Sequence, residues 1–231
     1  MRILVISDVH GNIEALNAVL KEPCDAVLFA GDIVDYGPRP KECLQKLKEE
    51  TLFFVRGNHD NAAGFGVDCR CSPAMHDLSA ETRKFTRKVL NPQELKFLAS
   101  LPLSSEFLLD GKKFFMVHAS FSDPLFKYLN PNKISASEIE REFENIDADF
   151  VIYGHTHFPI LIKRKKNGLI LNPGSVGQPR DGDPRASYAV IDTEKNKVDF
   201  YRKEYNIEKV ARDIKERGLP EKLIDILYQR V

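Results

Sequence analysis

The sequence has no excess of either charge, because 34 lysine and arginine residues balance 34 aspartate and glutamate residues. A chain without net charge has no field strong enough to select nucleic acid or an anionic membrane by charge alone. No specific nucleic-acid partner is therefore indicated, and the basic run at residues 163–166 is expected to be a solvent-facing turn. Any anionic substrate must be held by local contacts.

We also expect neither a membrane-spanning segment nor a secretory leader. No uninterrupted apolar run approaches the roughly 20 residues that a transmembrane helix needs. The first predicted strand begins at Arg2, without a positively charged leader and a following apolar stretch. We therefore expect a cytoplasmic protein that does not associate with membranes.

Cysteine is scarce, and the four cysteines, Cys24, Cys43, Cys69 and Cys71, do not form paired CxxC motifs. This spacing argues against a structural zinc site. Reduced thiols are the default expectation, and the closely spaced Cys69 and Cys71 are candidates for redox activity.

Length and composition favour one domain. A chain of 231 residues with 42% hydrophobic residues can bury one sizeable core. No linker, internal repeat or low-complexity segment divides the chain, so we predict a single domain over residues 1–231. A helical tail is predicted over residues 207–231, packed on the outside of the domain or on a second subunit of a homo-oligomer.

Five short apolar segments each run into residues that can bind a metal. The segments are residues 2–7, 26–30, 52–55, 113–117 and 149–153, and the residues that follow them are Asp8, His10, Asp32, Asn58, His118, His155 and His157. Parallel strands present reactive groups at their carboxyl ends, along one edge of a sheet. We therefore expect these residues to converge.

Helical patterns separate the first strands. Apolar residues recur at helical spacing over residues 12–20 and 41–49, which predicts a βαβαβ opening and a parallel sheet. Further helices are predicted over residues 78–89, 92–100 and 135–143. Residues 61–76 lose the pattern and are predicted to form an irregular active-site loop, because loops beside a site usually carry specificity.

Residues 106–109 and 113–117 are predicted to form a hairpin about Asp110-Gly111. The last third of the chain then changes character. Four short strands follow at residues 160–163, 169–171, 187–191 and 198–201. They suggest a second, largely antiparallel sheet. The expected fold class is α/β, with two sheets that share a sandwich core and helices outside.

The candidate ligands narrow the class of metal. Five of the six histidines lie at strand ends, together with Asp8, Asp32 and Asn58. Such mixed nitrogen and oxygen donors suit divalent Mn, Fe, Zn, Co or Ni better than calcium. Seven ligands are too many for one ion that must keep an open position. Two ions that share a carboxylate, separated by roughly 3.5–4 Å, fit better and can hold a phosphoryl group.

The order of these motifs resembles that of the calcineurin-like metallophosphoesterase superfamily. The motifs are Asp8-x-His10, Gly31-Asp32-x-x-Asp35, Gly57-Asn58-His59-Asp60, Val117-His118 and Gly154-His155-x-His157. The stretch from Asn172 to Arg185 resembles a segment of its prokaryotic, small-substrate phosphodiesterase branch. The resemblance implies a four-layer αββα sandwich of two mixed β-sheets flanked by helices.

The resemblance also implies a role for each residue. The implied ligands are Asp8, His10 and His157 for one ion and Asn58, His118 and His155 for the other. Asp32 would bridge both ions, and a hydroxide between them would attack phosphorus in line. His59 would act as general acid, oriented by Asp35. The expected cofactors are two divalent ions, with manganese favoured.

Two departures from the protein phosphatases of this superfamily bear on the substrate. Those enzymes carry Asp-Arg-Gly and Asn-His-Glu, where this chain has Asp35-Tyr36-Gly37 and Asn58-His59-Asp60. The missing arginine removes one phosphate clamp, which shifts the prediction towards small phosphodiesters or phosphomonoesters, including nucleotide derivatives. The candidates for substrate binding are Arg56, Tyr36, Arg180 and Arg185.

Two alternatives stay open. One is a serine/threonine-type protein phosphatase, which the missing arginine disfavours. The other is a non-catalytic binding scaffold with the same fold, which the full set of ligands disfavours, because such scaffolds commonly lose ligands. His76 stands outside the pattern and is expected to be solvated or packed in a loop.

Overall fold

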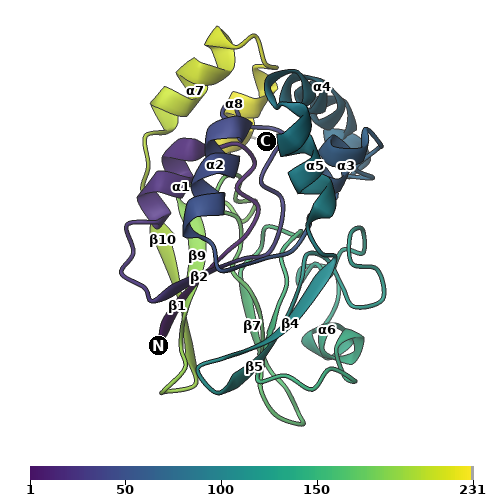
Figure 1. Ribbon diagram of the computed structural model, residues 1–231, viewed down its shortest axis with the longest axis vertical. Coiled ribbons are helices and arrows are strands. Elements are labelled where there is room, and N and C mark those ends of the chain that lie inside the picture. The colour runs from purple at the N-terminus through teal and green to yellow at the C-terminus, as the bar shows by residue number, and fades with distance from the viewer. Residues whose placement is uncertain (230–231) are drawn as a thin grey trace.

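Two five-stranded β-sheets stack face to face in the computed structural model, which describes residues 1–229 (Figure 1). Apolar side chains from both sheets fill the space between them. Ile3 and Val5 come from the first sheet, and Phe114 and Ile152 come from the second. Helices cover the outer faces, so the predicted αββα sandwich is confirmed.

The first sheet has the strand order β10-β9-β1-β2-β3. Its strands are β1 (Arg2–Ile6), β2 (Ala26–Phe29), β3 (Phe53–Phe54), β9 (Ala186–Asp192) and β10 (Lys197–Lys203). β1, β2 and β3 run parallel, whereas β9 joins β1 in antiparallel orientation. The crossover helices α1 (Ile13–Val19) and α2 (Pro40–Glu50) connect the parallel strands, which confirms the βαβαβ opening.

The second sheet has the strand order β4-β5-β6-β8-β7. Its strands are β4 (Ser104–Leu109), β5 (Lys112–Val117), β6 (Phe150–Ile152), β7 (Ile160–Lys163) and β8 (Leu169–Asn172). The hairpin of β4 and β5 is confirmed. Asp110 and Gly111 have φ angles of 50° and 70°, the left-handed pair that a two-residue hairpin turn favours.

The four strands of the last third do not form one antiparallel sheet, so that prediction was wrong. β7 and β8 extend the second sheet, where β8 lies parallel to β6. β9 and β10 return to the first sheet beside β1. An apolar pattern identifies a strand but does not name its partner. β9 is buried from Ala186 to Ile191 because it lies between β1 and β10 in the interior of the sheet.

Helices form the two outer layers. α1, α2 and α5 (Pro92–Ser100) pack on the first sheet, and α6 (Ala136–Glu142) packs on the second through Ile139. Figure 1 shows α3 (Asn58–Phe65), α4 (Pro73–Val89) and α5 gathered in the upper right and α6 in the lower right. Within residues 1–229, no helix has the length and apolar character that a bilayer span requires.

The irregular segment is shorter than the predicted loop over residues 61–76. α3 continues to Phe65 and α4 begins at Pro73, which leaves residues 66–72 irregular. Gly66 ends α3 with a φ of 72°, a left-handed conformation that favours glycine at this position. A glycine that suggested a loop therefore terminates a helix. Cys69 and Cys71 lie in the irregular residues, and both are free thiols.

The prediction of a solvent-facing basic turn at residues 163–166 is wrong for Arg164. Arg164 is buried. Its guanidinium donates hydrogen bonds to the backbone oxygens of Phe143, Ile146 and Ala148 at 2.9, 2.6 and 2.9 Å. The segment after α6 has carbonyls without helical partners, and arginine offers five donors in a fixed fork. Arg164 therefore joins the β7–β8 hairpin to this segment.

The C-terminal tail packs on its own chain. The tail consists of α7 (Ile207–Glu216) and α8 (Lys222–Leu227). Ile214 and Leu223 are buried in an apolar cluster with Tyr36. Arg39 donates two hydrogen bonds to the Asp213 carboxylate, at 2.7 and 3.0 Å. The tail is therefore tied to the segment that follows β2.

We expect Ile214→Ala to lower the free energy of unfolding by about 2–4 kcal/mol, because it leaves a cavity in a buried cluster. The measurement is urea denaturation followed by circular dichroism. Leu108→Ala is the control, since Leu108 is 69% exposed. A second unfolding transition confined to the tail would contradict a single domain over residues 1–231.

Candidate metal centre

The predicted metal ligands meet where strands of both sheets end. Asp8 and His10 follow β1, Asp32 follows β2, Asn58 begins α3 after β3, His118 follows β5, and His155 and His157 follow β6. All seven side chains are buried, with no residue more than 3% exposed. The fold therefore brings together residues that are up to 149 positions apart in the chain.

The backbone of five of these residues adopts a left-handed conformation. Asp8, His10, Asp32, His155 and His157 have φ angles between 47° and 66°. Each such residue costs on the order of 1–3 kcal/mol and persists only where the surrounding structure enforces it. Clusters of this kind are typical of functional sites, where the turn must present a side chain in one direction.

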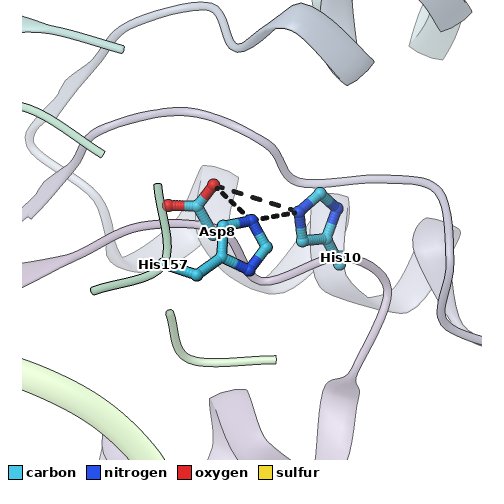
Figure 2. A group of neighbouring side chains, drawn as sticks. All are labelled: Asp8, His10 and His157. Carbon is cyan, nitrogen blue, oxygen red and sulfur yellow. Dashed lines mark hydrogen bonds and ion pairs between the residues drawn. The ribbon is translucent and has the colours of Figure 1, made fainter. Parts of the chain in front are cut away.

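Asp8, His10 and His157 form a compact set of donor atoms, here called the first ligand group (Figure 2). The Nε2 atoms of His10 and His157 are 3.3 Å apart, and His157 Nε2 lies 3.2 Å from Asp8 Oδ1. Figure 2 shows these donor atoms turned towards one another. Donors about 3 Å apart suit one ion that lies about 2 Å from each.

Asp32, His118 and His155 form a second set of donor atoms, and Asn58 adjoins it; together they are called the second ligand group. Asn58 Oδ1 lies 3.1 Å from His118 Nε2. Asp32 Oδ2 lies 3.3 Å from His118 Nε2 and 3.7 Å from His10 Nε2. The Asp32 carboxylate therefore contacts both ligand groups.

Backbone carbonyls fix the orientation of three imidazoles. The Nδ1 atoms of His10, His118 and His157 lie 2.9, 2.8 and 2.5 Å from the oxygens of Val34, Ala30 and Gln178. Since a carbonyl only accepts, each Nδ1 must donate, which turns Nε2 towards the other donor atoms. Burial lowers the pKa of His118, but the Asp32 carboxylate outweighs this effect and raises it to about 9, so a cation bound there would displace the Nε2 proton. A backbone carbonyl also orients the Asn58 side chain. Its Nδ2 donates to the Cys69 oxygen at 2.8 Å, which leaves Oδ1 facing His118.

Two buried polar atoms in the ligand groups are left without a hydrogen-bond partner in the described part of the chain. Asp8 Oδ1 and His155 Nε2 have no hydrogen-bond partner within residues 1–229. A buried polar atom without a partner costs about 1–3 kcal/mol. Burial lowers the pKa of His10, His155 and His157, which keeps these rings in the neutral form that binds a cation. The residues therefore fit two divalent cations, one in each group.

His59 lies beside the first ligand group and is held by Asp35. Its Nδ1 is 3.0 Å from Asp35 Oδ2, and Thr86 donates to Asp35 Oδ1 at 2.9 Å. The rings of His59 and His10 meet edge to face, with centroids 5.0 Å apart. Burial lowers the pKa of His59, but the carboxylates of Asp32 and Asp35 outweigh this effect and raise it to about 9. His59 can therefore carry a proton at neutral pH.

Two of the predicted substrate-binding residues lie at the centre. Tyr36 is buried, and its ring centroid is 4.7 Å from that of His59. Arg180 donates from Nη2 to Gln178 Oε1 at 2.8 Å. The backbone oxygen of the same Gln178 accepts from His157 Nδ1, so Arg180 is joined to the first ligand group through Gln178.

The other two predicted substrate-binding residues are engaged elsewhere. Arg56 donates from its guanidinium to the Ala99 oxygen and packs over the ring of Phe65, 5.2 Å from the centroid. Arg185 pairs with Asp183 at 2.6 Å in an exposed loop. Both guanidinium groups thus have partners of their own, and the structure does not bring them to the ligand groups.

The sequence analysis missed residues that support the ligands. Asp60 accepts hydrogen bonds from the backbone N–H groups of Asp32 and Ile33, both at 2.8 Å, and so fixes the turn that carries Asp32. Its position beside His59 could have indicated this role. Thr86 lies in the last turn of α4, 51 positions from Asp35, and no local pattern marks it.

Comparison with known families identifies the class of protein. The model of the calcineurin-like phosphoesterase superfamily domain matches residues 1–196. The chain belongs to this superfamily, as the order of its motifs predicted, and it is a hydrolase of phosphoric esters.

Particular relatives share most of the chain. The uncharacterized protein MJ0912 of Methanocaldococcus jannaschii is 36% identical over 98% of this chain and 97% of its own. Phosphodiesterase YfcE of Escherichia coli K12 is 24% identical over 84% of this chain and 89% of its own. The crystal structure of a metallophosphoesterase from Sphaerobacter thermophilus is similar over 100% of both chains, with 36% identity and a TM-score of 0.85.

We expect Asp32→Asn to reduce the bound metal from about two ions per chain to one or fewer, because Asp32 contacts both ligand groups. Inductively coupled plasma mass spectrometry after dialysis against manganese measures the stoichiometry. His76→Ala is the matched control, since His76 is exposed and pairs with Asp68 away from the centre. Two tightly bound ions in Asp32→Asn would contradict a shared carboxylate.

Proposed function

We propose that the chain is a two-metal phosphoesterase that hydrolyses small phosphodiesters or phosphomonoesters, including nucleotide derivatives, with manganese as the favoured metal. The observation that carries this proposal is the Asp32 carboxylate between two buried sets of donor atoms. The relative named phosphodiesterase YfcE favours the diester class.

The proposed ligands divide between two cations. Asp8, His10 and His157 hold one, Asn58, His118 and His155 hold the other, and Asp32 is shared. When bound, such a pair stabilises the phosphoryl oxygens as a Lewis acid and lowers the pKa of water. The protein fixes the donor atoms before substrate arrives, because backbone carbonyls hold the imidazoles in place. Preorganised donors need little rearrangement during the reaction.

His59 is proposed to protonate the departing alkoxide. Its Nδ1 is engaged by Asp35, which leaves Nε2 for proton transfer. Asp32 and Asp35 raise its pKa against the effect of burial, so the ring holds the proton that the leaving group requires. Thr86 positions Asp35, and Asp35 positions the ring.

Tyr36 disfavours the alternative of a protein phosphatase. It occupies the position of the arginine in those enzymes and contacts both His10 and His59, with ring centroids 4.9 and 4.7 Å away. Burial raises the pKa of Tyr36, so the phenol is neutral and adds no positive charge for a phosphate. In this proposal, Arg180 supplies that charge instead.

Removal of metal is expected to abolish hydrolysis of bis(p-nitrophenyl) phosphate, and added manganese is expected to restore it, because the ligand groups supply no nucleophile of their own. Release of p-nitrophenolate is measured before chelation, after dialysis against EDTA and after reloading. Circular dichroism at each stage separates loss of metal from loss of structure. If the folded, reloaded protein hydrolyses no diester, monoester or phosphopeptide, the proposed function is wrong.

His59→Ala is expected to keep both metals and to lower kcat for an alkyl phosphate ester by about 100- to 10,000-fold, because the alkoxide then leaves unprotonated. The loss should be smaller for a p-nitrophenyl ester, whose leaving group is stable as an anion. Steady-state kinetics with the two esters test this difference. Equal losses on both esters would exclude His59 as the proton donor.

A further inference from the structure

Tyr128 lies over a proposed metal ligand, although no sequence motif marks it. Its ring centroid is 3.9 Å from that of His155, and the two planes are inclined by 32°. Tyr128 is 36% exposed, whereas His155 is buried. Part of the Tyr128 ring therefore remains open to solvent. An aromatic surface therefore adjoins the second ligand group beside His155.

The loop that carries Tyr128 is held by contacts before and after this residue in the chain. The Tyr153 hydroxyl donates to the Leu129 oxygen at 3.3 Å. The Arg70 guanidinium packs over the ring of Phe126, 4.8 Å from the centroid. A side chain that is fixed before binding loses little conformational entropy when a ligand contacts it. Tyr128 is therefore a preorganised surface.

A hollow of about 320 Å³ borders the same residue. Its lining combines the apolar side chains of Leu129 and Ile134 with four charged groups, those of Lys127, Glu138, Arg141 and Glu142. Small-molecule sites begin at about this volume, and they pair apolar walls with a few polar groups. The hollow has room for a planar ring beside Tyr128.

We propose that the open face of Tyr128 is a stacking platform for a planar aromatic ester group, such as a nucleobase, of the phosphodiester hydrolysed at the metal centre. The inference rests on the proposed function and narrows its substrates to esters in which the retained group, the one that does not leave, carries a planar ring. Stacking of a base on an aromatic side chain tolerates any base. The platform therefore selects for a ring and does not distinguish one base from another.

The test compares two diesters with the same leaving group. Thymidine 5′-(p-nitrophenyl phosphate) retains a nucleoside, whereas ethyl p-nitrophenyl phosphate retains an alkyl group. The ratio of their kcat/KM values isolates recognition of the retained group, because the bond that breaks is the same. We expect the metal-loaded protein to prefer the thymidine ester. In Tyr128→Leu the ratio should fall about tenfold, and in Tyr128→Phe it should stay within about twofold.

Tyr201→Leu is the matched control. Tyr201 is 37% exposed and stacks on Tyr188, with centroids 5.5 Å apart, on β10. The ratio of kcat/KM values should therefore not change in this variant. Equal losses on both esters in Tyr128→Leu would mean that Tyr128 only packs on His155, and would overturn the platform. So would a wild-type protein that does not distinguish the two esters.

A binding measurement separates failure of the platform from failure of the proposed function. Isothermal titration calorimetry with thymidine 5′-monophosphate and ethyl phosphate requires no turnover. Weaker binding of only the nucleotide to manganese-loaded Tyr128→Leu supports the platform, even if neither diester is hydrolysed. Unchanged binding of both compounds overturns it. Metal analysis of each variant ensures that the ligand groups are equally loaded.

Discussion

The buried carboxylate of Asp32 is the contact on which the centre depends. Its Oδ1 accepts a hydrogen bond from the backbone N–H of His59 at 2.9 Å, and its Oδ2 lies near the Nε2 atoms of His118 and His10. A buried charge is costly unless it is paired, so the turn around Asp32 needs strong support. Asp60 provides this support by accepting hydrogen bonds from the backbone of the same turn. The Asp32 carboxylate thus contacts histidines of both ligand groups and the backbone of His59 in α3.

The centre requires both sheets at once. Asp8 and Asp32 come from β1 and β2 of the first sheet, whereas His118 and His155 come from β5 and β6 of the second. The side chains packed between the sheets set the distance between these strand ends. A change in the core between the sheets would therefore alter the distances among the donor atoms, even without contact to any ligand. In this fold, the packing of the core therefore also sets the geometry of the metal centre.

The sequence predicts the ligands better than it predicts their surroundings. A polar residue directly after an apolar strand is a local pattern, and the fold brings all seven such residues together. Partners far apart in the chain leave no such pattern. The sequence could not reveal that β9 pairs with β1, that Thr86 supports Asp35, or that Tyr128 covers His155. Arg56 shows the converse, because its position after β3 suggested the substrate, yet its guanidinium binds the Ala99 oxygen.

The C-terminal helices lie outside the region that the superfamily model matches, which ends at residue 196. Ile214 and Leu223 from these helices nevertheless border a hollow together with His10 and Tyr36. One wall beside the first ligand group is therefore built from a segment that the superfamily model does not include. The chemistry can be inherited with the strands of the matched region while the C-terminal helices change. Enzymes of common ancestry could in this way acquire different substrates without any exchange of metal ligands.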